Sequence, residues 1–329
     1  MQTTSPRSRS RAALRLVETR ELSRDDWLSV RRNGIGGSDA AAAVGISPYM
    51  SPLELWLIKT GRDAKLPKPD SEDTTDPVYW GTLLEPIVAA AYTKQTGRRL
   101  RRVNAVLQHP TIPFMLANLD REVTGNRDVQ ILECKTAGEF GARAWREGVP
   151  EYVQVQVQHQ LAVTGKQAAD VAVLICGQKL EVHRIERDDD LIARLIPLEA
   201  AFWRYVEMDT PPPADGSESS DRALRCLYPS GSGTVDFTGD RALCAAFADL
   251  VAVRADIEGR EKVESRLKQQ IQQAIGTAER AVFETGAVSF KRSRDGSGFD
   301  LARFQAEQPE VAARYAVPKP GTRRFLLST

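Results

Sequence analysis

The chain has 329 residues, of which 42% are hydrophobic, and its formal net charge at pH 7 is +1. That hydrophobic fraction is enough for a packed core, and the small net charge excludes any inference about partners from total charge. The longest apolar runs are far shorter than the roughly 20 residues of a membrane span, and no two of the four cysteines have the CxxC spacing of a structural metal site. We therefore expect a reduced cytoplasmic protein of one or two domains with no membrane partner.

The first third of the chain predicts helices separated by glycine-rich and charged loops. Residues 1–20 are basic and rich in serine, and we expect a disordered tail there. A helix begins near Ser23, and GIGGSDAAAAVG (34–45) predicts a glycine-rich loop that leads into an alanine-rich helix. Apolar residues recur at helical spacing in 51–61 and 80–97, and each segment ends in glycine.

The middle of the chain has the alternation of strands. Three β-leaning segments are RRVNAVLQHP, FMLANLDREV and VQILECKTA. The apolar residues of 150–165 fit both the two-residue alternation of a strand and the i, i+4 spacing of a helix. The length of the segment and its terminal Gly165 favour a helix. A hairpin over 169–187 and a helix over 191–208 follow.

A composition break at PPPADGSESSD predicts a boundary. We place a linker at 211–222, between a core of residues 21–210 and a C-terminal region of residues 223–329. Within that region, 239–280 is charge-rich with helical apolar spacing, which favours a short coiled-coil arm. A hairpin around Thr285–Gly286 follows it.

Two acids and a lysine in the middle of the chain form the main candidate site. Glu133 and Lys135 stand two apart in ILECKTA, so a strand places both on one face. Asp120 precedes Glu133 with twelve residues between them, which fits two antiparallel strands joined by a turn. Mg²⁺ binds carboxylates and water and would neutralise the acids, while the lysine would orient or activate a water molecule near a phosphate. The alternative is a solvated strand face.

Two further features are compatible with nucleic acid. Gly34, Gly36 and Gly37 allow backbone N–H groups to approach an anion at a helix start, and Arg31 adds a charged donor; a tight turn before a packed helix explains the same loop. The basic cluster RRLRR (98–102) would contact a DNA backbone or form a solvated surface.

Five blocks in this order resemble the YqaJ-type viral recombinase family: IGGSDAAAAVGISPYMSPLELWLIKTG, WGTLLEP, LANLD, LECKTA and VQHQLAVTG. That family is similar to phage lambda exonuclease and belongs to the PD-(D/E)xK nuclease superfamily. The resemblance covers roughly residues 20–208. It implies an α/β fold with a restriction-endonuclease-like core, a central mixed sheet flanked by helices, and a mainly helical C-terminal extension.

The resemblance also implies residue roles. Asp120, Glu133 and the main-chain carbonyl of Cys134 would ligate Mg²⁺, for which Mn²⁺ is a substitute, and Lys135 would act on the attacking water. The remaining implied residues are Glu85 and Gln156 beside the catalytic centre, and Arg31, Ser38, Asn118 and Tyr152 at a 5′-phosphate pocket. Pro110 stands where the lambda enzyme has a further aspartate, which puts a second metal in doubt.

The implied activity is a Mg²⁺-dependent 5′-to-3′ exonuclease of a phage-type recombination system in a bacterium or phage-infected host. It would act on duplex DNA ends and leave 3′ single-stranded tails for a single-strand annealing protein, and family members include ring trimers. The alternatives are a non-catalytic DNA-end-binding recombination protein and an endonuclease of the same superfamily, which would need no 5′-end pocket.

Overall fold

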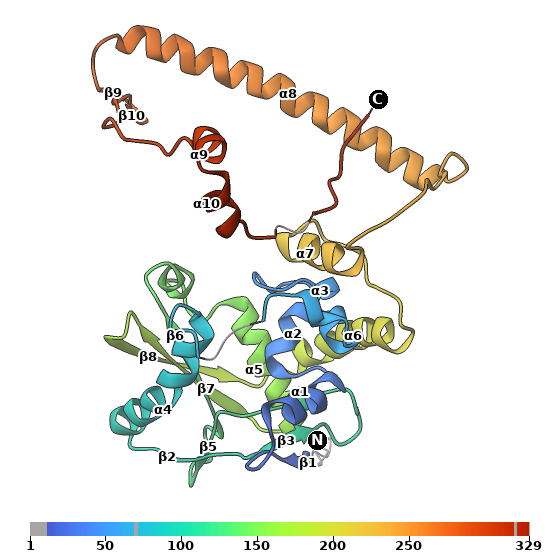
Figure 1. Ribbon diagram of the computed structural model, residues 1–329. Coiled ribbons are helices and arrows are strands. Elements are labelled where there is room, and N and C mark those ends of the chain that lie inside the picture. The colour runs from blue at the N-terminus through green and yellow to red at the C-terminus, as the bar shows by residue number, and fades with distance from the viewer. Residues whose placement is uncertain (1–11, 69–71, 319–320, 329) are drawn as a thin grey trace, which may run out of the picture. The chain divides into compact units, whose positions relative to one another are not determined.

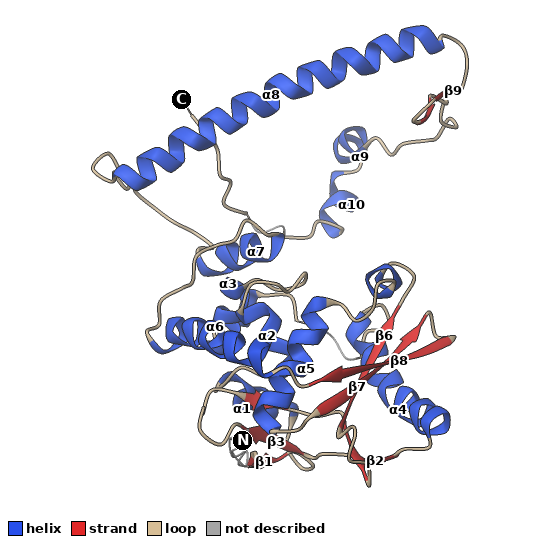
Figure 2. Ribbon diagram, turned by 180° about the vertical axis from the view of Figure 1, so that it is seen from behind, coloured by secondary structure: helices blue, strands red, loops and turns tan. Residues whose placement is uncertain are grey.

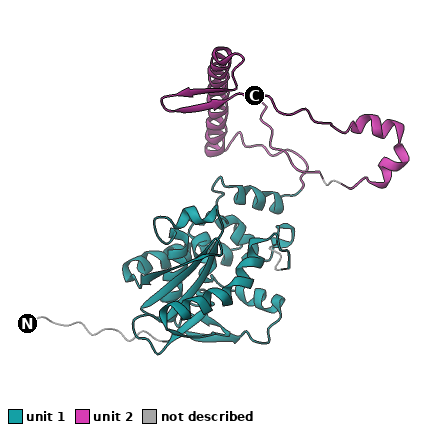
Figure 3. Ribbon diagram, turned by 90° about the vertical axis from the view of Figure 1, so that its left-hand side faces the viewer, with its two compact units in different colours: residues 1–229 teal, residues 230–329 magenta. Residues whose placement is uncertain are grey.

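The computed structural model describes residues 12–68, 72–318 and 321–328, and the chain divides into two compact units (Figure 3). The first unit comprises residues 1–229 and the second comprises residues 230–329. Over the described ranges, no helix has both the length and the apolar character needed to cross a membrane.

A five-stranded mixed sheet forms the centre of the first unit, with the order β2-β5-β6-β7-β8 (Figure 1). Its strands are β2 (Arg99–Arg101), β5 (Arg121–Thr124), β6 (Ile131–Ala137), β7 (Ala168–Ile175) and β8 (Lys179–Glu186). β6 and β7 are parallel, and the other neighbouring pairs are antiparallel. A smaller antiparallel sheet joins β1 (Leu14–Glu18), β3 (Ala105–Gln108) and β4 (Leu116–Ala117).

Alternation along the central strands separates two apolar cores. Ile131 and Val171 belong to the core that contains α5 (Glu151–Thr164), whereas Leu132 and Ala172 belong to the core that contains α4 (Pro77–Thr96). Because successive strand residues point to opposite faces, α5 and α4 cover opposite sides of the sheet (Figure 2). The predicted α/β class, with a central mixed sheet flanked by helices, is confirmed. The expected helix over 150–165 is also confirmed, and it ends at Gly165 in the left-handed conformation.

A third core is made by helices packed around the alanine-rich segment. These are α2 (Gly37–Ala43), α3 (Pro52–Lys59), α6 (Asp189–Glu207) and α7 (Glu218–Leu227). The preceding helix, α1 (Arg24–Arg32), has no buried residue. Ser23 caps α1 and Ser51 caps α3, each by accepting a backbone N–H in the first turn. A Cβ at Gly37 would lie 3.1 Å from Cγ of Gln160, so glycine permits the close approach of α2 to α5. Short 3₁₀ turns lie at Asp63–Lys65 and Gly141–Trp145.

Two predicted boundaries differ from the structure. The expected disordered tail of 1–20 is wrong at its end, because β1 pairs with β3 in a register that places Leu14 opposite Gln108; residues 1–11 lie outside the described part of the chain. The predicted linker at 211–222 overlaps α7, where Ser219 donates to Glu54 Oε2 of α3 at 2.6 Å. This buried contact holds α7 on the first unit, so the division between units falls after residue 229.

The second unit consists of one long helix, a hairpin and two short helices. Its elements are α8 (Arg241–Ile275), β9 (Arg280–Phe283), β10 (Gly286–Ser289), α9 (Leu301–Glu307) and α10 (Pro309–Arg314). Three ion pairs at i,i+4 spacing support α8, which has no buried residue. Phe283 pairs with Gly286, so the hairpin turn lies one residue earlier than expected. A coiled-coil role for α8 stays a prediction.

Candidate active site

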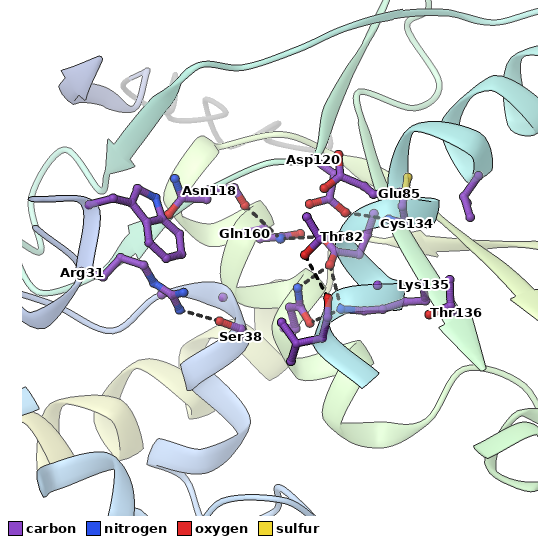
Figure 4. Close-up of a pocket in the computed structure, with 18 residues that line it drawn as sticks. Arg31, Ser38, Thr82, Glu85, Asn118, Asp120, Cys134, Lys135, Thr136 and Gln160 are labelled. Carbon is purple, nitrogen blue, oxygen red and sulfur yellow. Dashed lines mark hydrogen bonds and ion pairs between the residues drawn. The ribbon is translucent and has the colours of Figure 1, made fainter. Parts of the chain in front are cut away.

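A cavity of about 420 Å³ lies where α1, α2 and α4 meet β6 and α5 (Figure 4). Its polar lining comprises Arg31, Ser38, Thr82, Glu85, Asn118, Asp120, Glu133, Lys135, Thr136, Gln156 and Gln160. In Figure 4, Arg31 and Ser38 lie at one end of the cavity, while Glu85, Asp120 and Lys135 lie at the other. Residues from distant parts of the sequence are thus brought to a single site.

The strand β6 supplies the acid and the lysine from one face, as alternation predicted. Glu133 and Lys135 share the face of Ile131, which packs toward α5. The Lys135 ammonium lies 2.8 Å from Glu133 Oε1 and donates to Gln156 Oε1 at 2.9 Å. Burial lowers the pKa of Lys135, but the larger combined effect of Glu133 and Asp120 raises it. Lys135 is therefore a cation at neutral pH, suited to orienting a water or a phosphate.

Two glutamine side chains of α5 hold the Glu133 carboxylate. Gln156 Nε2 donates to Glu133 Oε1 at 2.5 Å, and Gln160 Nε2 donates to Glu133 Oε2 at 2.8 Å. Gln160 is 1% exposed, and its Oε1 has no hydrogen-bond partner among the described residues. Gln160 was missed as a site residue, although its position four residues after Gln156 places both on one helix face.

Asp120 precedes β5 and faces the carboxylate of Glu133. Its Oδ2 accepts the N–H of Cys134 at 2.8 Å. Burial, and then the charges of Glu133 and Glu85, raise the pKa of Asp120 well above its usual value, against the opposing effect of the Cys134 hydrogen bond. Burial and the neighbouring acids also raise the pKa of the Cys134 thiol, so that side chain is a poor nucleophile. The site therefore concentrates negative charge that the protein alone compensates incompletely.

Arg121 offsets part of this charge, and sequence reasoning missed it. The Arg121 guanidinium donates to Glu85 Oε1 and to the carbonyl of Asp120, each at 2.5 Å, and its side chain is 8% exposed. The Glu85 side chain reaches the cavity from α4, as the resemblance implied. Nothing in the local spacing of the sequence pairs Arg121 with a glutamate 36 residues earlier.

The donor atoms of this end suit a hard divalent cation. Carboxylate oxygens are the ligands that Mg²⁺ prefers, and the raised pKa of Asp120 reflects acids that an added cation would stabilise. The unpartnered Gln160 Oε1 is a further polar atom at the site. As arranged, Glu133 is bonded to Lys135 and both glutamines, and over the described ranges no three acidic, histidine or cysteine side chains form a metal-binding group. The chemistry of these residues therefore fits Mg²⁺.

The opposite end of the cavity is basic. Arg31 donates to Ser38 Oγ at 2.7 Å, and the Arg31 guanidinium carbon lies 4.7 Å from the centre of the Trp27 ring. Asn118 also lines the cavity. The prediction that backbone N–H groups of the glycine-rich loop approach an anion is wrong at Gly36. The Gly36 N–H donates to Asp39 Oδ2 at 2.9 Å and is already satisfied inside the protein. Arg31 supplies a charged side-chain donor to this end of the cavity, and Ser38 supplies a hydroxyl.

Other candidates lie apart from the cavity. Tyr152 does not line it; its hydroxyl lies 3.4 Å from that of Tyr49, and the two rings pack edge to face. In the RRLRR cluster, Arg98 pairs with the buried Asp170, which gives it a structural contact. His159 is buried with Glu199 and does not line the cavity.

Comparisons with known proteins match the part of the chain that contains the five sequence blocks. A family model described as the YqaJ-like viral recombinase domain matches residues 26–167. Over 223 residues the chain is 42% identical to uncharacterized protein YqaJ of Bacillus subtilis (strain 168), which covers 67% of this chain and 68% of that protein.

Among solved structures, the chain is similar to an alkaline exonuclease from Laribacter hongkongensis, with 25% identity, a TM-score of 0.46, and coverage of 56% of this chain and 93% of that one. A phage related exonuclease from Haemophilus somnus 129PT is 12% identical, with a TM-score of 0.40 and coverage of 55% and 97%. The extent and identity of the match to YqaJ show that the chain belongs to the YqaJ-like viral recombinase family, as the five sequence blocks predicted.

Proposed function

We propose that the protein is a Mg²⁺-dependent exonuclease that degrades one strand of duplex DNA in the 5′-to-3′ direction. The observation that supports this most is the common cavity of Asp120, Glu133 and Lys135 with Arg31 and Ser38. Metal-assisted phosphodiester hydrolysis needs a site for a divalent cation, and a cationic side chain near the phosphate assists it. Recognition of a 5′ end needs a separate donor group for the terminal phosphate.

Each residue of the cavity has a role that its chemistry suggests. Asp120, Glu133 and the main-chain carbonyl of Cys134 hold Mg²⁺, or Mn²⁺ in its place. When bound, the metal supplies Lewis-acid stabilisation of the charge that develops on the phosphate. Lys135, fixed between Glu133 and Gln156, orients water and phosphate oxygens near the scissile bond. Arg31, Ser38 and Asn118 bind the terminal 5′-phosphate, and Glu85 helps to compensate the charge of the metal.

The partners follow from the reaction. The substrate is a duplex DNA end, and the product is a 3′ single-stranded tail, which a single-strand annealing protein would bind. The C-terminal unit, residues 230–329, is available for assembly or for gripping DNA. A ring trimer would keep the enzyme on its substrate, as in some relatives of the family.

Linear and circular duplex DNA incubated with the full chain test this proposal. Linear DNA labelled at its 5′ or 3′ ends should be lost from 5′ ends in Mg²⁺, while EDTA or a closed circle should prevent loss. Glu133→Gln should abolish cleavage. Glu122→Gln is the matched control and should retain activity, because Glu122 pairs with Lys166 and Arg101 and does not line the cavity. Binding without cleavage would support a non-catalytic end-binding protein, and cutting of circles would support an endonuclease.

A further inference from the structure

Beneath the basic end of the cavity lies a cluster of three charged side chains from three helices. Arg31 of α1 donates to Asp39 Oδ1 of α2 at 3.1 Å, and Lys59 of α3 donates to Asp39 Oδ2 at 2.7 Å. The side chains of Arg31, Asp39 and Lys59 are 24%, 12% and 3% exposed. Burying a lysine is costly unless it is paired and hydrogen-bonded, so this arrangement calls for a physical reason.

Asp39 is the acceptor that fixes the direction of Arg31. Its carboxylate receives Arg31 on one oxygen, and Lys59 and the N–H of Gly36 on the other. Burial would raise the pKa of Asp39, but Lys59 and Arg31 hold it far below its usual value. The Trp27 ring lies against the guanidinium, and Ser38 accepts from the same nitrogen as Asp39. Arg31 is thus held by an acid, a hydroxyl and an aromatic ring.

Lys59 determines how much positive charge remains for a ligand. Arg31 paired with Asp39 alone would be a neutral pair. Burial lowers the pKa of Lys59, and the contact with Asp39 opposes this by favouring the ammonium form. With Lys59 protonated on the far oxygen of Asp39, the three side chains together carry a net charge of +1. Lys59 also donates to the main-chain carbonyl of Arg31 at 2.9 Å, which ties α3 to the end of α1. The buried lysine therefore compensates Asp39 and leaves the charge of Arg31 available at the cavity.

We propose that Asp39 and Lys59 are positioning residues for the recognition of a terminal 5′-phosphate. Asp39 aims the Arg31 guanidinium, and Lys59 offsets the charge of Asp39 so that Arg31 attracts a dianion. This inference rests on the proposed function, since it assigns the source of end selectivity at the same site. A cluster that only joined α1, α2 and α3 would affect all DNA ends equally when weakened.

The test measures binding in the absence of cleavage. Full-length protein carrying Glu133→Gln is titrated, by fluorescence anisotropy in Ca²⁺, into one short duplex with either a 5′-phosphate or a 5′-hydroxyl. The readout is the dissociation constant of the 5′-hydroxyl duplex divided by that of the 5′-phosphate duplex, so a high ratio means a strong preference for the phosphate. Lys59→Met should lower this ratio by roughly tenfold, the effect of losing about one charged interaction. Lys166→Met, which removes a lysine paired with Glu122 away from the cavity, should leave the ratio unchanged.

For a second variant, Asp39→Asn, the inference and simple electrostatics predict opposite changes in the preference for a 5′-phosphate. Asp39→Asn removes a negative charge close to the pocket, so long-range attraction alone would strengthen the preference for a 5′-phosphate. The positioning role predicts a weaker preference, because Arg31 loses its charged acceptor. Asparagine is nearly the same size and keeps one oxygen, so Asp39→Asn tests the inference even where Lys59→Met does not fold. An unchanged or stronger preference in Asp39→Asn would overturn the inference.

Two controls separate this inference from the proposed function. Wild-type protein that fails to degrade linear duplex DNA in Mg²⁺ would remove the proposed function, whatever the binding ratios are. Arg31→Ala should abolish the preference for a 5′-phosphate; a preference that survives it would place the pocket elsewhere and overturn the inference. Where Arg31→Ala loses the preference and both Lys59→Met and Asp39→Asn keep it, the inference alone fails.

Discussion

Asp120→Asn should make the metal-free protein more stable while it abolishes cleavage. Asp120 is a buried acid that faces Glu133 and Glu85, and these surroundings raise its pKa. A carboxyl group whose pKa is raised on folding favours the folded state only while it is protonated, and that contribution is lost as pH rises through the folded-state pKa. At pH 8 the unfolded side chain is ionised, so folding must either bury that charge or bind a proton, and asparagine removes this cost.

The size of the effect follows from the contacts that change. Asparagine retains an oxygen that can accept the N–H of Cys134, now as a neutral hydrogen bond in place of a charged one, at a loss of about 1 kcal/mol. Removal of a buried charge that its neighbours repel stabilises the folded state by several kcal/mol, which exceeds this loss. The net gain is on the order of 1 to 3 kcal/mol, and a unit of about this size shifts its melting temperature by roughly 2 to 4 °C per kcal/mol.

Thermal unfolding in EDTA at pH 8 and at pH 5 measures this. The stabilisation by Asp120→Asn should be largest at pH 8 and shrink at pH 5, and Mg²⁺ should stabilise the wild type more than the variant. Asp170→Asn is the matched control: Asp170 is also a buried acid, but it accepts from the Tyr92 hydroxyl at 2.5 Å and pairs with Arg98, so its loss should destabilise by about 1 to 3 kcal/mol. A lower melting temperature for Asp120→Asn at pH 8 would refute the reasoning.

Three further changes have effects that the structure fixes in direction. Gly34→Ala should cost about 1 to 3 kcal/mol in urea unfolding, because a Cβ there would lie 2.5 Å from the carbonyl oxygen of Phe114; an unchanged midpoint would show that the loop adjusts freely. His159→Asn should cost about 3 to 5 kcal/mol below pH 6, since it leaves the buried Glu199 without its cation. Burial alone would lower the pKa of His159, yet Glu199 raises it, so wild-type stability should fall as pH rises through that raised value, and His159→Asn should flatten this dependence. Gln160→Leu should raise the Mg²⁺ concentration for half-maximal cleavage by about 10- to 100-fold with little change in DNA binding; normal Mg²⁺ dependence would argue that Gln156 alone orients the acid.

Local sequence patterns were sufficient to place Glu133 and Lys135 of the candidate site together. Two-residue spacing places Glu133 and Lys135 on one strand face, and the helix preferred for 150–165 places Gln156 over that face. These are properties of a single element, which its own periodicity determines. The prediction of a disordered tail was wrong at Leu14 because the pairing of β1 with β3 is a long-range contact, which local composition does not reveal.

The residues that sequence reasoning missed are those whose role depends on the choice of partner. Lys59 reads as an ordinary basic residue near the end of a helix, and its burial against Asp39 appears only when α3 packs beside α2. Arg121 likewise acquires its role from Glu85, on a helix that packs on the sheet. Charge compensation inside a protein is set by tertiary contacts, so spacing along the chain cannot reveal it.

The two ends of the cavity use buried charge in opposite ways. At the basic end, Lys59 and Arg31 outnumber Asp39, and the surplus is positive. At the acidic end, Asp120, Glu133 and Glu85 outnumber Lys135 and Arg121, and the surplus is negative. Such a separation costs stability unless ligands neutralise both ends. A cation at the acids and a phosphate at Arg31 would do so together, so under the proposed function a DNA end and its metal should bind this cavity better together than either does alone.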